Sequence, residues 1–264
     1  MKQFFAVLLL TASVLLTGCL DIVEDMTIQA NGSGTYKTTM DMSGMMEMIE
    51  MMAAMDTSAK KSEQELFSKD MDTTILMKDF SDTASNLTAE QKRFFGKGKM
   101  NLKMSKQERK FILAMDFPFS TPEEMETLAK MTEGGKGFSM LGKAQNNSIL
   151  GSATDEAGLP SMDGLFDVQY RKGLLERKIN PAKLTAFQKN DKVKEMEQAG
   201  EMLEQMKMQT VIHLPAPAKK VTGEKVKLSD DRKTITIQTS FYDLFKNPSA
   251  MAYRVEYWSF KNDF

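Results

Sequence analysis

The chain has 264 residues, and its 35 Lys and Arg nearly balance its 36 Asp and Glu, which gives a formal net charge of −1 at pH 7. Nucleic acid is not an expected partner, because such binding needs a basic surface and the sequence has no basic stripe with interleaved aromatic residues. The single cysteine and the single histidine exclude an internal disulfide and a zinc site built on paired histidines. We predict no cofactor.

The first 18 residues have the organisation of a secretory signal peptide. Lys2 supplies a positive charge, and a mainly apolar, uncharged run follows from Phe4 to Leu16. This run is shorter than the roughly 20 apolar residues that a membrane-spanning helix needs. We therefore expect residues 1–18 to be cleaved. The alternatives are an uncleaved anchor and an ordinary signal peptide with a chance cysteine.

The run ends in Leu16-Thr17-Gly18-Cys19, which resembles the lipobox of bacterial lipoproteins. The resemblance implies that Cys19 carries an S-diacylglycerol group, becomes the first residue of the mature protein and is N-acylated. Several acyl chains on one residue hold a protein stably in a bilayer. The membrane would then be a partner through the lipid on Cys19, and residues 19–264 would form an extracytoplasmic body.

The residues after Cys19 bear on which membrane holds the lipid. An Asp directly after the cysteine would resemble the inner-membrane retention signal of enterobacteria, and this chain has Leu20 there. An acidic cluster would resemble the surface-export signal of Bacteroidetes lipoproteins, but here apolar residues interrupt the acidic ones. We expect the outer membrane, with the protein facing the periplasm.

The mature part begins with a predicted β-hairpin. Residues 22–29 and 36–42 are rich in strand-forming residues around Asn31-Gly32-Ser33-Gly34, whose residues tolerate the backbone angles of a tight turn. A helix is predicted to follow over residues 44–55, because apolar side chains recur there every three or four residues. One face of this helix carries four methionines: Met45, Met48, Met52 and Met55.

These methionines allow three interpretations. They can be core residues, since Met fills irregular gaps and the chain uses 24 of them in nearly every predicted element. They can line a deformable apolar groove for an acyl chain or a partner peptide, because Met-rich surfaces repack around different ligands. They can hold Cu(I) through their thioethers, which soft metal ions prefer.

The middle of the chain has clear start and stop signals. Residues 73–77 predict a short strand, and Thr88-Ala89-Glu90-Gln91 is a capping box for a helix that ends at Gly96. Residues 100–105 and 109–117 predict two strands. Thr121-Pro122-Glu123-Glu124 predicts a further helix to about residue 131.

The sequence pattern changes twice after that helix. Residues 134–164 are rich in glycine, serine and asparagine without any period, which predicts one long mobile loop. Strands are predicted at 165–170 and 174–179, and Asn180-Pro181 opens a short helix. A longer amphipathic helix is predicted to begin at Asp191 and reach residue 206.

The C-terminal part is rich in strands. They are predicted at residues 210–214, 219–222, 234–239 and 250–258, with a short helix at 242–246. Strands and helices alternate without regular βαβ repeats, which is typical of an α+β fold with a mainly antiparallel sheet. We predict that residues 19–264 form a single α+β domain, with amphipathic helices packed on the sheet.

Part of this pattern resembles a known group of proteins. The N-terminal hairpin, residues 214–223 (LPAPAKKVTG), the strand at 234–239 and Tyr242-Asp243-Leu244 are similar to LppM-type bacterial lipoproteins. In that group a strand ends in Pro-Gly, a Val and a Gly follow, and then come a strand and a short helix. This chain has Pro217-Ala218 at the Pro-Gly position. The resemblance implies an α+β lipid-binding-like fold without catalytic residues. The chain is also similar to uncharacterised lipoproteins of Bacteroidetes, which implies no function.

No motif in the sequence specifies a reaction. The sole histidine, His213, alternates with Ile212 and Leu214, which predicts a surface-facing strand residue rather than a metal ligand. Phosphate-binding and dinucleotide-binding loops are absent. We therefore predict a non-enzymatic envelope lipoprotein that binds an apolar ligand, such as a lipid, or an envelope protein. An enzyme with an unrecognised carboxylate site is the alternative, and Cu(I) binding is the third possibility.

Overall fold

The computed structural model describes residues 20–44, 70–83, 88–132, 164–198 and 200–258. Three predicted features fall outside these ranges. They are the cleaved segment with Cys19, nearly all of the glycine-rich loop at 134–164, and the methionine face formed by Met45, Met48, Met52 and Met55.

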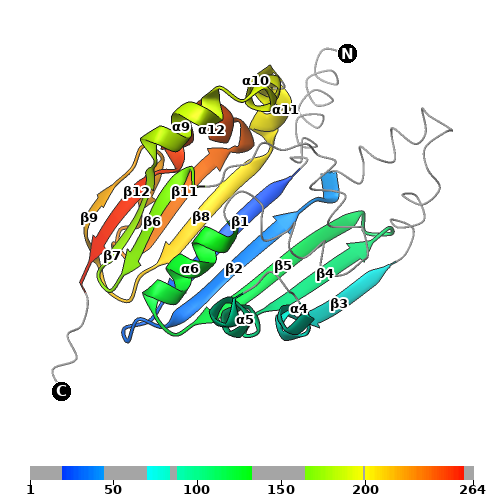
Figure 1. The fold of residues 1–264 in the computed structure, drawn as a ribbon, viewed down its shortest axis with the longest axis horizontal. Coiled ribbons are helices and arrows are strands. Elements are labelled where there is room, and N and C mark those ends of the chain that lie inside the picture. The colour runs from blue at the N-terminus through cyan, green and yellow to red at the C-terminus, as the bar shows by residue number, and fades with distance from the viewer. Residues whose placement is uncertain (1–19, 45–69, 84–87, 133–163, 199, 259–264) are drawn as a thin grey trace, which may run out of the picture.

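The fold is α+β, as predicted, and its largest element is an eight-stranded sheet with the strand order β10-β11-β8-β1-β2-β5-β4-β3 (Figure 1). Its neighbouring strands pair antiparallel except for β1 and β8, which pair in parallel. The strands are β1 (Asp21–Ile28), β2 (Gly34–Asp41), β3 (Met71–Leu76), β4 (Lys99–Ser105), β5 (Lys110–Phe119), β8 (Lys207–His213), β10 (Val226–Leu228) and β11 (Thr234–Ser240).

A smaller sheet of four antiparallel strands has the order β6-β7-β12-β9. Its strands are β6 (Phe166–Arg171), β7 (Leu174–Ile179), β9 (Ala218–Thr222) and β12 (Tyr253–Tyr257). Buried residues of both sheets belong to one hydrophobic cluster, so the two sheets share a core.

The helices are short and lie on two parts of the molecule (Figure 1). Three of them lie over the large sheet: α4 (Met77–Thr83), α5 (Ala89–Phe95) and α6 (Pro122–Thr132). The others gather beside the small sheet: α9 (Pro181–Gln188), α10 (Asp191–Gln198), α11 (Gly200–Gln205), α12 (Phe241–Lys246) and the 3-10 turn η2 (Pro248–Met251).

Strand alternation explains how the large sheet forms the core. Along β5 the side chains of Phe111, Leu113, Met115, Phe117 and Phe119 are buried, while the intervening ones are partly or fully exposed. A half-buried antiparallel strand has this period of two, and each fully buried large apolar side chain stabilises the fold by roughly 1.5–3 kcal/mol. The opposite face of the sheet carries mostly polar residues, together with apolar ones such as Val23, Ile112 and Val211. We call the face that carries the buried side chains the inner face, and the opposite one the outer face.

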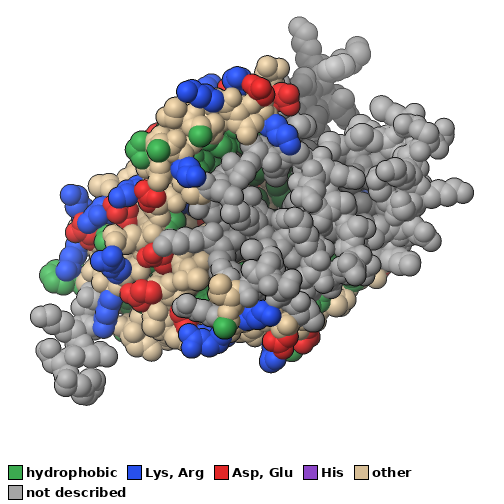
Figure 2. Space-filling model, viewed as in Figure 1, with side chains coloured by type: hydrophobic (Ala, Val, Ile, Leu, Met, Phe, Trp, Pro, Cys, Tyr) green, Lys and Arg blue, Asp and Glu red, His purple; other side chains and the backbone are tan. Residues whose placement is uncertain are grey.

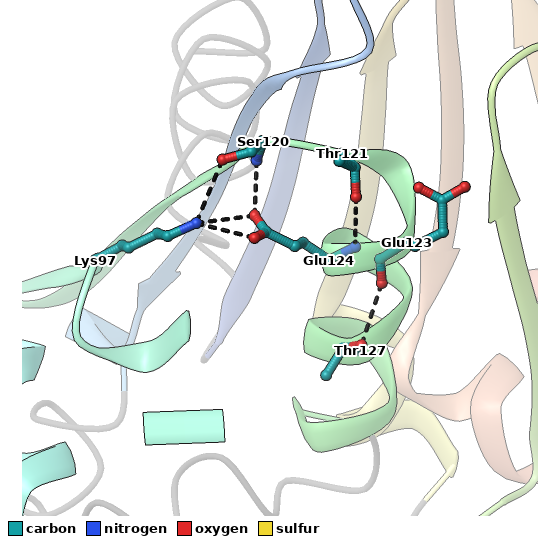
Figure 3. Close-up of polar contacts among 6 residues, drawn as sticks. All are labelled: Lys97, Ser120, Thr121, Glu123, Glu124 and Thr127. Carbon is teal, nitrogen blue, oxygen red and sulfur yellow. Dashed lines mark hydrogen bonds and ion pairs between the residues drawn. The ribbon is translucent and has the colours of Figure 1, made fainter. Parts of the chain in front are cut away.

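The first turn of α6 shows how sequence signals fix the helix ends (Figure 3). The backbone N–H of Glu124 donates to Thr121 Oγ1 at 3.3 Å, and the Glu124 carboxylate accepts the N–H of Ser120 at 2.7 Å. Lys97, which precedes β4, places its Nζ 3.0 Å from the same carboxylate. The predicted capping arrangement is therefore present, and it also ties α6 to the α5–β4 connection.

The structure differs from the sequence-based prediction at three elements. Helix α4 and strand β10 were not predicted. The helix predicted from Asp191 to residue 206 is present as α10 and α11, on either side of residue 199, which is outside the described residues. The last strand begins at Tyr253 rather than at residue 250, because Pro248 opens η2 and the N–H of Ala252 bonds to Ser249 O. Tertiary packing decides these elements and their boundaries, and local sequence propensity does not indicate them.

Gly34, at the start of β2, should not tolerate a side chain. A Cβ there would collide with the carbonyl oxygen of Thr27 and lie 2.5 Å from the ring of Phe119. We expect Gly34→Ala to lower the free energy of unfolding by about 3 kcal/mol, the upper range for overpacking. Urea denaturation measures this, with Thr35→Ala on the outer face as the control at under about 1 kcal/mol. Equal losses in both variants would contradict the close approach.

Candidate functional site

A carboxylate lies on the inner face of the large sheet, among apolar residues. Glu24 of β1 shares this face with the buried Met26 and Ile28. Its Oε1 accepts the hydroxyl of Tyr36 at 2.8 Å, and its Oε2 accepts the hydroxyl of Thr210 at 2.8 Å. These bonds come from β2 and β8, the two strands that flank β1, so both carboxylate oxygens are used within the sheet.

The small sheet supplies the counter-charge. Arg177 of β7 places Nη1 4.0 Å from Glu24 Oε2, and its guanidinium lies over the ring of Phe166 at 4.2 Å. The side chains of Arg177 and Glu24 are only 18% and 28% exposed. Close by, the hydroxyls of Tyr170 and Tyr253 share a hydrogen bond of 2.6 Å. We call these groups the inter-sheet cluster, because they join strands of both sheets.

The electrostatics keep the tyrosines and the arginine of the cluster in one protonation state. Burial, reinforced by the charge of Glu24, raises the pKa of Tyr36 well above 10.0. Burial and then Tyr170 raise the pKa of Tyr253 in the same way. Burial works to lower the pKa of Arg177, but Glu24 and the nearby phenols outweigh it and raise this pKa above its ordinary value. The tyrosines therefore remain donors, and Arg177 remains a cation, at every physiological pH.

This arrangement joins the two sheets. The charged neighbour that the structure gives Glu24 is a cation, whereas general acid-base hydrolysis of glycosides needs two acids across a gap. The nearby Glu126 of α6 accepts the backbone N–H of Tyr170 at 3.0 Å, and so covers the edge of β6. Sequence analysis missed the cluster. The signal was present, because alternation along β1 places Glu24 between the inward-facing Ile22 and Met26.

His213 lies on the outer face, as predicted. Its Nε2 is 3.3 Å from Asp25 Oδ2, and its Nδ1 is 3.5 Å from Thr234 Oγ1. The side chains of His213 and Asp25 are 42% and 41% exposed. Among the described residues no group of three or more His, Cys, Asp and Glu side chains could hold a metal ion. The contact is an exposed pair, which contributes little to stability.

The inner face has a methionine-rich half at the end where β1 begins. Its side chains, which we call the methionine floor, are Met40 and Met42 next to Met71, Met104 and Met208. Helices α4 to α6 lie over the other half of this face (Figure 1). The predicted groove residues Met45, Met48, Met52 and Met55 follow in the chain directly after Gly44, outside the described residues. The structure therefore tests neither their contacts nor those of Cys19.

The chain enters the sheet immediately after Cys19. The carbonyl of Leu20 accepts the N–H of Lys207 at 3.0 Å, and β1 begins at Asp21. Strand β1 then has β8 on one side and β2 on the other, in the middle of the sheet. Only one peptide link separates Cys19 from a residue that is hydrogen-bonded into the fold.

The exposed charges do not form a field of one sign. Figure 2 shows basic and acidic side chains interspersed over the described part of one face. This agrees with the net charge of −1 and gives no extended basic surface for a polyanion.

Comparison with known proteins does not identify a function for these residues. No protein-family profile matches the chain, and no curated protein matches its sequence. Among solved structures, the folded domain of the LppM protein of Mycobacterium tuberculosis, determined by NMR, aligns with 93% of this chain and 94% of that domain. The sequence identity is 9% and the TM-score is 0.39. The likeness is weak and assigns no function.

Loss of the cation from the inter-sheet cluster should destabilise the protein. We expect Arg177→Met to lower the free energy of unfolding by about 2 kcal/mol, because it leaves Glu24 as a partly buried charge without its counter-ion. The adjacent Lys178 is exposed, so Lys178→Met is a matched control with a change below about 0.5 kcal/mol.

Urea denaturation of both variants measures the difference. Adding Glu24→Gln to Arg177→Met should recover part of the loss, since a neutral amide needs no cation. Equal stability of the Arg177 and Lys178 variants would show that the ion pair does not hold the sheets together.

Proposed function

We propose that this chain is a lipid-anchored, non-catalytic protein of the bacterial envelope, held by acyl chains on Cys19. The supporting observation is the tetrapeptide Leu16-Thr17-Gly18-Cys19, followed within two residues by the central strand of a folded sheet. Within the described residues, none of the helices has the length and apolar character to cross a membrane. In this proposal the lipid provides the attachment, at the outer membrane and facing the periplasm.

The proposed activity is binding of an apolar ligand, such as an acyl chain, or of an envelope protein. The methionine floor supports it, because flexible thioether side chains adapt to ligands of irregular shape. In this proposal Met45, Met48, Met52 and Met55 line the other side of the same groove. The residues that flank this part of the chain lie at the same end of the sheet as the methionine floor. Register aligns Asp41 of β2 with Ile112, Ile112 with Lys103, and Lys103 with Asp72 of β3.

The absence of a catalytic role is part of the proposal and rests on the inter-sheet cluster. Glu24 is a partly buried acid with both oxygens engaged by hydroxyls and a cation at 4.0 Å. Both oxygens of this carboxylate already accept hydrogen bonds within the sheet, so neither is directed at a substrate. An enzyme with a carboxylate pair remains the alternative that a second facing acid would favour.

Removal of the lipid should release the protein from the membrane without unfolding it. In one variant an ordinary cleavable signal peptide replaces residues 1–18 and Cys19 becomes Ser, so that neither a lipid nor an uncleaved leader remains. We expect it in the soluble periplasmic fraction with an unchanged urea midpoint, because no acyl chain holds it. The control is the wild-type chain, in which Leu16-Thr17-Gly18-Cys19 is intact, and it should stay with membranes. A lipid-free variant that still pellets after a salt wash would refute the anchor.

Substitution of the four methionines distinguishes an apolar groove from a copper site. Changing Met45, Met48, Met52 and Met55 together to Leu conserves apolar volume, and each change should cost less than about 1.5 kcal/mol. Native mass spectrometry of protein extracted from its own membrane should show lipid adducts on both the wild type and the variant. Titration with Cu(I) should show negligible uptake by both. Uptake by the wild type alone would make copper binding the function of these methionines, since Leu has no donor atom.

A further inference from the structure

The end of the large sheet where β1 begins also carries a protruding hairpin turn. Register places Asp21 opposite Asp41, Asp41 opposite Ile112, and Ile112 opposite Lys103, so these residues lie at one level of the sheet. Strand β4 continues past this level to Ser105, and the β4–β5 turn spans residues 106–109. The turn is therefore the part of β4 and β5 that extends furthest beyond the start of β1.

The length of chain before β1 fixes how far the anchor can reach. Cys19 precedes Asp21 by two residues, which span at most roughly 7 Å. Lys106 lies three residues past Lys103, at roughly 10 Å beyond the same level along the strand direction. Since the turn projects at least as far as Cys19 can, acyl chains on Cys19 bring the turn to the membrane surface.

The turn is held in shape by its neighbours. The N–H of Lys106 donates to Asp70 Oδ1 at 2.8 Å, and the N–H of Glu108 donates to Ser105 Oγ at 3.3 Å. Arg109 has a φ of 49°, in the left-handed region that closes a tight turn. A fixed, exposed turn presents the same side chains to any surface that it meets.

The charge of this hairpin is positive. Four basic residues outnumber the two acids at this turn. The basic residues are Lys103, Lys106, Arg109 and Lys110. Of the acids, Glu108 pairs with Lys103 and Lys110 at 3.3 and 3.2 Å, and Asp70 accepts the backbone N–H of Lys106. On the other side of β1, beyond β8, acidic residues outnumber basic ones along α10 and α11. A negatively charged surface would attract the hairpin and repel those helices, so the sheet should tilt toward its β4–β5 side.

We propose that the β4–β5 turn is a contact surface for anionic phospholipid headgroups of the membrane that holds the lipid anchor. This inference rests on the proposed acylation of Cys19, which supplies the proximity. The turn then sets the orientation: the β1-start end faces the bilayer, and the β1–β2 turn points away from it. The methionine floor, at the same end, lies next to the membrane.

The test uses the full-length lipidated protein, purified from its membrane and reconstituted into vesicles of phosphatidylethanolamine and phosphatidylglycerol. The lipid occupies the sole native cysteine, so one introduced cysteine gives one labelling site. Gln107→Cys places a fluorophore on the exposed tip, and Ala30→Cys places it at the exposed β1–β2 turn. Eight-residue β1 separates the two ends by roughly 25 Å.

Lipid spin-labelled at the headgroup quenches only nearby fluorophores. We expect quenching at position 107 to exceed that at position 30 by about threefold or more, because of the strand-length separation. In the Gln107→Cys background, Lys106→Glu should reduce quenching about twofold, as should replacing phosphatidylglycerol by phosphatidylcholine. Lys172→Glu makes the same charge change at the β6–β7 turn and should have no effect.

Three outcomes would overturn the proposal. Equal or stronger quenching at position 30 would mean that the domain is not oriented as argued. Quenching at position 107 that does not respond to Lys106→Glu or to anionic lipid would remove the headgroup contact. Protein that fails to float with the vesicles would refute acylation itself, and so the proposed function together with this inference, whereas the first two outcomes leave the anchor intact.

Discussion

The pairing of β1 with its two neighbours is the interaction on which the rest of the structure depends. Strand β1 pairs antiparallel with β2 and in parallel with β8, and it is the only link between strands β10-β11-β8 and strands β2-β5-β4-β3 in the described sheet. Glu24 of β1 bonds to Thr210, 186 residues away along the chain. Such non-local contacts must overcome a large loop-closure entropy, which predicts slow, cooperative formation of the sheet.

The same strand joins the fold to the proposed anchor and to the second sheet. Leu20 is already hydrogen-bonded to Lys207, so motion of the domain relative to the lipid would be limited to the bonds around Cys19. Glu24 faces Arg177 of the small sheet. A tension or tilt applied at the membrane would therefore reach both sheets through β1, without a flexible linker to absorb it.

The two faces of the large sheet have separate roles. The outer face is mostly polar and carries exposed pairs such as His213 with Asp25, which keep it solvated. The inner face holds the core, and its apolar residues change from closely packed phenylalanines near α5 to methionines near the start of β1. Aromatic rings with fixed geometry stabilise one packing, whereas thioethers accept several. Adaptable packing thus lies at the end that the proposed lipid brings to the bilayer.

Sequence alone determined the local features whose causes are local: the turn around Gly32, the caps of α6 and α9, the alternation in β5, the outward position of His213 and the α+β class. It also supplied the tetrapeptide Leu16-Thr17-Gly18-Cys19, on which the proposed acylation rests and which depends on no tertiary contact. Only the tertiary structure decided the division into two sheets, the parallel pair of β1 and β8, and the contact of Glu24 with Arg177. These features depend on residues far apart in the chain. Their strands pair because they bury apolar surface together, and this pairing does not change the hydrophobic periodicity of either strand.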